Sequence, residues 1–268
     1  MKVFCCQCDI VWENKEANFA KVEHLLDQAR PPAGSLVALP EMSFTGFSMN
    51  VARIAQHEPD HTEAFLKAAA KRYGIHLLAG TVTQTQDGLG RNEAVLVTPL
   101  GSVANRYQKL HLFSPAREHL FFEAGNHAGI FEWNGGLVAP FICYDLRFPE
   151  EFRVAADLGA ELYIVIANWP RARELHWLTL LQARAIENQA IVVGVNRCGR
   201  DPHVDYSGRS VIVAPDGAVI ADAGENERSI SAEFDWVIVR EYRQQFPALS
   251  DRRRPAPVLN STFDWSTP

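Results

Sequence analysis

Short apolar runs alternate along the chain with stretches whose apolar residues recur at helical spacing. The runs predict strands at residues 3–10, 35–39, 75–83, 93–98 and 102–108 in the first half, and at 137–142, 162–167, 191–196, 209–214, 218–221 and 230–234 in the second. Four helices are expected near residues 22–30, 62–74, 149–159 and 173–189. Pro31-Pro32 ends the first of them, and Thr62 can cap the second. This alternation predicts an α/β fold.

The two halves of the chain follow each other without a break in composition. No Ser- and Gly-rich linker or block of charge separates them. We therefore expect one domain spanning residues 1–268, with a polar tail from about residue 246 that shows no periodicity.

Composition excludes several classes of protein. The 268 residues are 47% hydrophobic and carry a net charge of −6, which disfavours nucleic acid as a partner. No apolar run reaches the roughly 20 residues of a membrane span, so no membrane partner is expected. The N-terminus lacks the pattern of a signal peptide, so we expect a cytoplasmic protein whose five cysteines are reduced thiols.

Three reactive side chains follow predicted strands. Glu41 comes after the run at 35–39, Lys109 after 102–108 and Cys143 after 137–142. Sites in open α/β sheets form at this carboxyl edge, so the three can converge. Such a trio supplies a nucleophile, a base and a cation.

A thiol nucleophile needs this combination. With a pKa of about 8.5 a free thiol is mostly protonated at neutral pH. Glu41, with its pKa raised by partial burial, can take the proton, and Lys109 can stabilise the oxyanion of a tetrahedral intermediate. The backbone N–H of Tyr144 offers a second oxyanion donor.

The sequence motifs around these residues resemble those of the nitrilase (carbon–nitrogen hydrolase) superfamily. They are Leu39-Pro40-Glu41, Tyr107-Gln108-Lys109-Leu110-His111 and Ile142-Cys143-Tyr144-Asp145-Leu146-Arg147, and the likeness extends from Val3 to about Phe234. The resemblance implies a four-layer α-β-β-α sandwich, a Glu-Lys-Cys triad, a homodimer or higher homo-oligomer, and no metal or organic cofactor. It also implies a second catalytic glutamate, for which Glu118 fits better than Glu123.

Within the superfamily the chain is most similar to ω-amidases, which hydrolyse the terminal amide of substrates such as 2-oxoglutaramate or 2-oxosuccinamate. The run Asn168-Trp169-Pro170 belongs to this likeness. A substrate of this kind carries a carboxylate, which a guanidinium binds well. The residues expected to bind the substrate are Arg147, Asn168, Trp169, Arg171, Arg173, Phe44 and Phe47, with Tyr144 also at the cavity wall.

Other interpretations stay open. Hydrolysis of an N-carbamoyl compound, of deaminated glutathione or of a nitrile would use the same triad. A metal or redox site at Cys5-Cys6-x-Cys8 is disfavoured because no second cysteine pair has zinc-like spacing. A non-catalytic scaffold conflicts with the complete triad, and a Cys-His dyad with His111 or His176 is less favoured than structural roles for these histidines.

Overall fold

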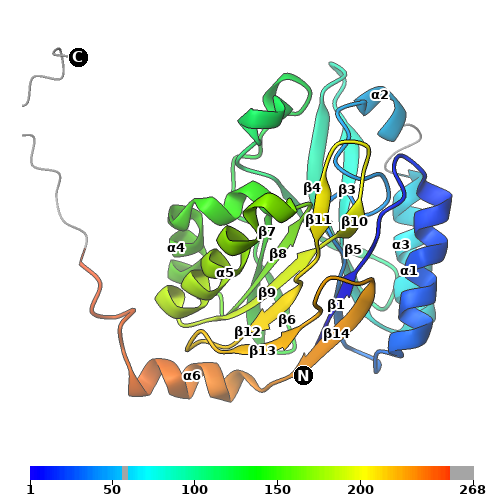
Figure 1. The fold of residues 1–268 in the computed structure, drawn as a ribbon. Coiled ribbons are helices and arrows are strands. Elements are labelled where there is room, and N and C mark those ends of the chain that lie inside the picture. Colours follow the sequence, from blue (N-terminus) through cyan, green and yellow to red (C-terminus); the bar gives the residue numbers. More distant parts are fainter. Residues whose placement is uncertain (56–59, 254–268) are drawn as a thin grey trace, which may run out of the picture.

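The computed structural model describes residues 1–55 and 60–253, and the proline-rich end of the predicted tail, with Pro255 and Pro257, lies outside them. Two six-stranded sheets lie between helices (Figure 1). The sheet from the first half of the chain has the order β14-β1-β2-β3-β4-β5, in which β1, β2 and β3 are parallel. Its strands are β1 (Lys2–Gln7), β2 (Leu36–Ala38), β3 (His76–Gln84), β4 (Gly90–Val97), β5 (Val103–Gln108) and β14 (Arg228–Glu233).

The second sheet repeats this plan with the order β13-β12-β9-β8-β7-β6, in which β7, β8 and β9 are parallel. Its strands are β6 (Phe131–Trp133), β7 (Gly136–Ile142), β8 (Leu162–Ala167), β9 (Ile191–Asn196), β12 (Val211–Val213) and β13 (Val219–Asp222). A separate hairpin joins β10 (Cys198–Arg200) to β11 (Asp205–Ser207). In both sheets the parallel strands are central, so their carboxyl ends meet at one edge.

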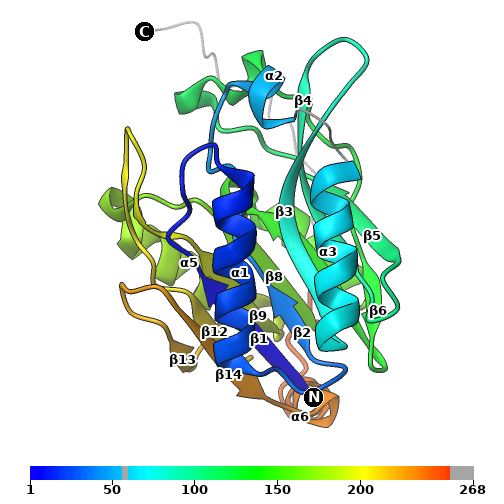
Figure 2. The ribbon, with the colours of Figure 1, turned by 90° about the vertical axis from the view of Figure 1, so that its right-hand side faces the viewer.

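Helices cover the outer face of each sheet. Helices α1 (Lys15–Ala29) and α3 (Asp60–Tyr73) lie over the first sheet, and α4 (Pro149–Asp157) and α5 (Glu174–Asn188) lie over the second (Figures 1 and 2). The four-layer α-β-β-α sandwich expected from the sequence is confirmed. None of the helices in the described part of the chain combines the length and apolar character needed to cross a bilayer.

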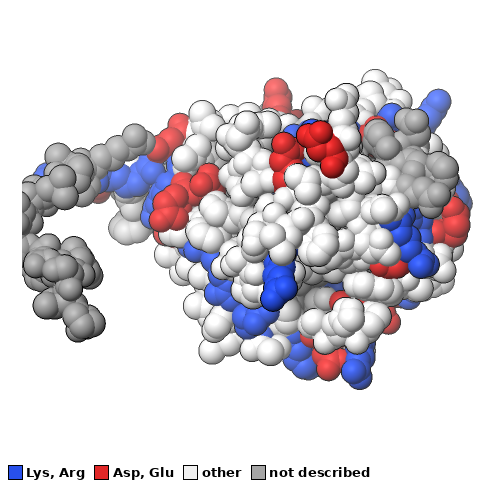
Figure 3. Space-filling view, turned by 90° about the horizontal axis from the view of Figure 1, so that it is seen from above, with Lys and Arg blue, Asp and Glu red and all other residues white. Residues whose placement is uncertain are grey.

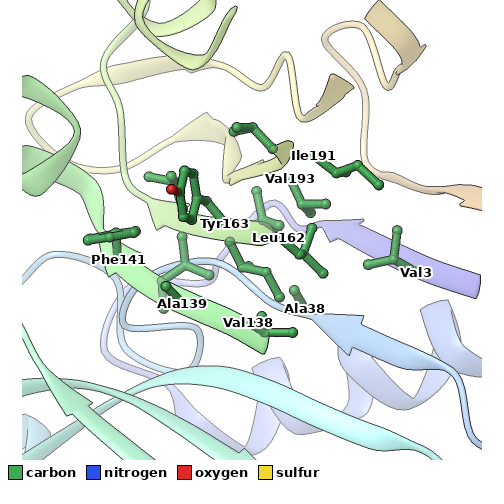
Figure 4. Packing of buried hydrophobic residues seen from close by; sticks show 14 of the residues in the cluster. Val3, Ala38, Val138, Ala139, Phe141, Leu162, Tyr163, Ile191 and Val193 are labelled. Carbon is green, nitrogen blue, oxygen red and sulfur yellow. The ribbon is translucent and has the colours of Figure 1, made fainter. Parts of the chain in front are cut away.

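The main core fills the space between the sheets. Val3 and Ala38 of the first sheet face Val138, Leu162 and Val193 of the second (Figure 4). A second cluster packs α1 and α3 against the first sheet and includes Cys6 and Cys8, whereas Cys5 points into the main core. Cys5 and Cys6 thus lie on opposite faces of β1, and Cys8, directly after the strand, packs in the same cluster as Cys6; all three are buried. Among the described residues no group of three or more His, Cys, Asp or Glu could hold a metal ion.

Several short elements were not predicted. Strands β6, β10 and β11 have three residues each, of which at most two are buried, so neither an alternating pattern nor an apolar run marks them. Helix α6 (Trp236–Gln245) begins where Asp235 accepts a hydrogen bond from the Val237 N–H, and it buries only Trp236 and Val239. Thr62 lies inside α3 and does not precede it, so its prediction as the cap was wrong.

One glycine allows the loop after β2 to pass close to β3. A Cβ at Gly80 would lie 2.4 Å from the Met42 backbone N and 2.6 Å from the Glu41 Cα. The Gly80 N–H donates to the Pro40 carbonyl, and the Ser43 N–H donates to the Gly80 carbonyl. Glu41 is therefore fixed by backbone contacts, independently of its own side chain.

Candidate active site

The structure brings the four predicted catalytic side chains together at the carboxyl edge of the sheets. Glu41 follows β2, Lys109 follows β5, and Cys143 begins the 3₁₀ helix η3 (Cys143–Arg147) directly after β7. Glu118 lies in the 3₁₀ helix η2 (Glu118–Leu120). Glu41, Lys109 and Glu118 are completely buried.

Lys109 lies between two carboxylates. Its Nζ is 2.8 Å from Glu41 Oε1, 2.9 Å from Glu118 Oε2 and 3.2 Å from Glu118 Oε1. Although burial alone would lower the pKa of Lys109, the charges of Glu118 and Glu41 raise it above its usual value. The lysine is therefore a permanent cation, suited to stabilising negative charge and not to accepting a proton. Glu123, the weaker sequence candidate, forms an ion pair with Arg91 near the surface.

Glu41 accepts hydrogen bonds on both carboxylate oxygens. Oε1 accepts from Lys109 Nζ and, at 2.8 Å, from Asn92 Nδ2, while Oε2 accepts from the Asn168 backbone N–H at 2.9 Å. Burial alone would raise the pKa of Glu41, but the Lys109 ammonium and these hydrogen bonds hold it below its usual value. The expectation that burial raises this pKa was therefore wrong, because it omitted the donors. Glu41 is ionised and can act as a base.

Cys143 has a strained backbone and a protonated thiol. Its φ of +48° lies in the left-handed region, which non-glycine residues rarely adopt and which is common at functional turns. Burial, the Glu41 charge and a hydrogen bond with Glu41 raise the pKa of the thiol well above its usual value, against the opposing effect of Lys109. The resting pair is thus a neutral thiol beside an ionised carboxylate.

A cavity of about 110 Å³ opens over the thiol. Its wall is mostly apolar and includes Phe47, Phe113, Cys143, Tyr144, Arg147, Asn168, Trp169, Arg173 and Tyr206. Six of the residues predicted to contact substrate or wall the cavity therefore line it. The volume suits a substrate of a few heavy atoms.

Two predicted substrate residues lie elsewhere. Phe44 does not line this cavity, because its ring packs against Phe19 and Phe65 in the core beneath α1 and α3. Arg171 forms an exposed two-bond ion pair with Glu225. Both residues were predicted because they are close in sequence to site residues. Side chains at neighbouring positions of a loop point in different directions, so closeness in sequence did not place them at the cavity.

His111 pairs with a buried aspartate. Asp145 Oδ1 is 3.1 Å from His111 Nδ1 and accepts the His111 backbone N–H, while its Oδ2 accepts from the Tyr107 hydroxyl and the Ile142 N–H. The His111 ring also stacks on Phe148. Asp145 thereby connects the chain beyond Lys109 to the turn that carries Cys143. His176 contacts Arg147, so the geometry favours Glu41 over either histidine as the partner of the thiol.

Sequence reasoning missed Asn92 and Asp145. Asn92 is completely buried, and its backbone carbonyl accepts from the Lys109 N–H while its amide reaches both glutamates. The available signal was a polar pair, Asn92-Glu93, at the start of an otherwise apolar strand. Such a residue is expected to have a specific partner, because burying an unpaired amide is unfavourable.

The pKa directions predict a broad pH profile. We expect kcat/KM to fall in acid only when Glu41 is protonated, at a pH below the usual pKa of a glutamate. At mildly alkaline pH we expect kcat/KM to stay constant, because the thiol of Cys143 remains protonated. Because the pKa of Glu41 is lowered in the folded state, its contribution to stability is present above the unfolded pKa and is lost as pH falls through the folded one. Initial rates from pH 3 to 10, on protein shown to be folded at each pH, check this. An acid limb near neutrality would contradict it.

Comparison with known proteins agrees with this geometry. The carbon-nitrogen hydrolase family model matches residues 2–244. The chain is 40% identical over 254 residues to the ω-amidase YafV of Escherichia coli (strain K12), covering 94% of this chain and 96% of that one. It is 35% identical over 253 residues to the 2-oxoglutaramate amidase of Bacillus subtilis (strain 168), covering 94% and 97%.

A solved structure shows the same fold. A carbon–nitrogen hydrolase superfamily protein from Xanthomonas campestris, with an arsenic adduct in its active site, has a TM-score of 0.87 and 33% identity. The match covers 96% of this chain and 99% of that one.

Proposed function

Because the chain belongs to the carbon–nitrogen hydrolase family, we propose that it is an ω-amidase, which releases ammonia from the terminal amide of a small carboxylate-bearing substrate such as 2-oxoglutaramate or 2-oxosuccinamate. It is a hydrolase of non-peptide C–N bonds. The observation that carries the proposal is a single thiol at a small apolar cavity, beside a buried Glu-Lys-Glu cluster and with two guanidinium groups at the cavity wall.

Acylation is the first half of the reaction. Glu41 takes the proton of the Cys143 thiol as Sγ bonds to the amide carbon, and the carbonyl oxygen becomes an oxyanion. Lys109 and the Tyr144 backbone N–H stabilise this charge. Glu41 then gives its proton to the amide nitrogen, the C–N bond breaks, and ammonia leaves a thioester on Cys143.

Deacylation reverses these proton movements with water. Glu41, again a carboxylate, takes a proton from a water molecule whose oxygen bonds to the thioester carbon. The C–S bond breaks, the proton returns to sulfur, and the acid product is released. Glu118 contacts Lys109 and Asn92, so its role in this scheme is to hold the ammonium in place.

Two arginines can bind the substrate carboxylate. Arg173 lies over the Phe113 ring, with 5.5 Å between its guanidinium carbon and the ring centroid, and Arg147 lies over Trp169 at 4.9 Å. Within residues 1–55 and 60–253 neither guanidinium pairs with a carboxylate. Arg147 contacts His176 at 3.1 Å. Arg173 is therefore the freer of the two and the better candidate.

The substrate class is tested by ammonia release. Purified protein is given 2-oxoglutaramate, 2-oxosuccinamate, an N-carbamoyl amino acid, deaminated glutathione and a simple nitrile. We expect the two 2-oxo amides to give the highest kcat/KM. Turnover of the carbamoyl compound, deaminated glutathione or the nitrile alone would replace the ω-amidase assignment and leave the thioester chemistry intact.

Removing the Arg173 guanidinium should weaken the binding of carboxylate-bearing substrates only. We expect Arg173→Met to lower kcat/KM for 2-oxoglutaramate about 10- to 100-fold, mainly through KM, because a charged hydrogen-bonded pair is lost. The same variant should hydrolyse a neutral amide of similar length as the wild type does. Arg171→Met, which removes the exposed partner of Glu225, is the matched control. An equal loss with both amides would contradict the assignment.

A homodimer is also part of the proposal. Helices α4 and α5 expose Val154, Leu175 and Ile186, and Leu158 is exposed directly after α4. An apolar face of this kind supports association with a second copy. On the face in Figure 3, basic and acidic side chains are interspersed with uncharged surface. Leu175→Glu with Ile186→Glu should convert a dimer into a monomer in light scattering, whereas Leu100→Glu, at an exposed turn, should not. A wild-type monomer at micromolar concentration would exclude the dimer.

A further inference from the structure

Asn92 on β4 connects the two buried glutamates. Its Nδ2 donates to Glu41 Oε1 at 2.8 Å and to Glu118 Oε1 at 3.1 Å. A side-chain amide has two N–H donors, so both are used, one on each carboxylate. The side chain is completely buried, and the strand fixes its backbone because its carbonyl accepts the Lys109 N–H.

These contacts distinguish the two oxygens of Glu41. Each carboxylate oxygen can accept about two hydrogen bonds. Lys109 and Asn92 occupy both positions on Oε1. Oε2 accepts the Asn168 backbone N–H at 2.9 Å and a longer hydrogen bond, 3.3 Å, from the Asn168 side-chain amide. The donors on Oε2 are neutral and one of them is long, whereas Oε1 accepts two short bonds, one from an ammonium. Oε2 is therefore the oxygen that more readily accepts another proton.

The orientation of the Asn92 amide follows from the same contacts. Its Oδ1 is buried with no hydrogen-bond partner in the described part of the chain. A rotated amide would point this oxygen at two carboxylates, and the repulsion excludes that arrangement. The protein thus leaves one acceptor unpaired and directs both donors at the glutamates.

We propose that Asn92 is a positioning residue of the reaction: by occupying Oε1 of Glu41 it directs the thiol proton of Cys143 to Oε2, and by bridging to Glu118 it holds both carboxylates in place around one ammonium. The proposal rests on the proposed function for the role of Glu41 as the base. It adds a residue beyond the Glu-Lys-Cys triad and the second glutamate, and it assigns the two oxygens of Glu41 different tasks.

The test compares Asn92→Ala with Asn92→Asp. Both variants lose the donors, but aspartate keeps the shape of asparagine and adds a third carboxylate beside a single ammonium. We expect kcat to fall about 10- to 100-fold in Asn92→Ala, and to fall further in Asn92→Asp. Asn92→Leu, which keeps about the volume of asparagine without donors or charge, isolates the donors: a role limited to filling space predicts near wild-type kcat for it, whereas the positioning role predicts a loss like that of Asn92→Ala.

The pH profile supplies a readout that packing does not move. An N–H donor stabilises the charged form of a carboxylate, so its loss raises the pKa of Glu41. We expect the acid limb of kcat/KM in Asn92→Ala to move up by about one pH unit. Asn188→Ala is the matched control, because Asn188 is equally buried and also has an unpartnered Oδ1, but donates to the Arg184 carbonyl on α5. Its acid limb should stay in place.

Alkylation of Cys143 separates this proposal from the substrate assignment. The rate of modification by iodoacetamide, followed by mass spectrometry of the Cys143 peptide, reports on the Glu41–Cys143 pair without any amide. If the wild type fails to hydrolyse ω-amides but the acid limb of alkylation moves up in Asn92→Ala, only the substrate assignment fails. If Asn92→Asp keeps near wild-type alkylation with an unmoved acid limb, the role of Asn92 is overturned. Both variants are first checked for folding by circular dichroism and thermal unfolding.

Discussion

Cys143→Ala is expected to abolish ammonia release, lowering kcat by at least about 10⁴-fold, because Cys143 is the only thiol among the described residues that line the cavity. Cys143→Ser should be nearly as inactive, since a hydroxyl is far less acidic than a thiol and Glu41, with its lowered pKa, is too weak a base for it. The loss is measured as kcat with the best amide found for the wild type. The variants should remain folded, because alanine and serine are no larger than cysteine and the left-handed backbone does not depend on sulfur.

Cys198→Ala is the control for this loss. Cys198 is also a free thiol, but it is buried on the β10–β11 hairpin, and burial raises the pKa of its thiol to about 12. Its removal should leave kcat within a few-fold of the wild type. Residual turnover by Cys143→Ala above 1% of the wild-type rate would mean that the nucleophile has been assigned wrongly.

Lys109→Met is expected to remove both activity and much of the stability. The ammonium is completely buried between Glu41 and Glu118, so its loss leaves two uncompensated buried carboxylates. Breaking a buried ion pair in this way costs about 3–5 kcal/mol of unfolding free energy. Without the ammonium, the pKa of Glu41 rises in the folded state, because Lys109 is what lowers it against the effect of burial, so the variant should lose further stability as pH increases. Denaturant unfolding at pH 5 and pH 8 measures both effects.

Two further variants test whether the uncompensated buried charges cause the loss of stability in Lys109→Met. Lys109→Met combined with Glu118→Gln removes one of the uncompensated charges and should recover part of the lost stability without recovering activity. Lys21→Met removes a lysine from a partly exposed ion pair with Glu227, and this should change the unfolding free energy by less than about 1 kcal/mol. Equal destabilisation by Lys21→Met and Lys109→Met would contradict the description of a buried charge cluster.

The strand pattern predicted the parallel centre of each sheet well. Runs such as Leu162–Ala167 and Ile191–Asn196 are buried on both faces and therefore continuously apolar, which makes them visible in the sequence. Strands β6, β10 and β11 and the partly exposed helix α6 carry too few buried positions to give a period. The sandwich itself came from the resemblance, because nothing in the alternation says that two sheets stack.

Part of the site could also be predicted from the sequence. Glu41 and Cys143 follow the buried apolar strands β2 and β7, whose carboxyl ends are where sites form in sheets of this kind. Lys109 follows β5, a more polar edge strand antiparallel to β4, so its place in the site came from the resemblance. The pKa direction of Glu41 and the part played by Asn92 depend on hydrogen bonds between segments far apart in the chain, such as the bond from Asn168 to Glu41. Phe44 and Arg171 show the same limit, because a residue next to the site in sequence can point into the core or into solvent.

The acyl intermediate is the most direct test of the catalytic proposal. The wild-type protein is mixed with the amide it hydrolyses best, quenched in acid during turnover, digested, and the site of any acyl group is determined by mass spectrometry. We expect the acyl group of the substrate on the sulfur of Cys143, and its absence from the same peptide of Cys143→Ala. An acyl group attached to any other residue would contradict the account.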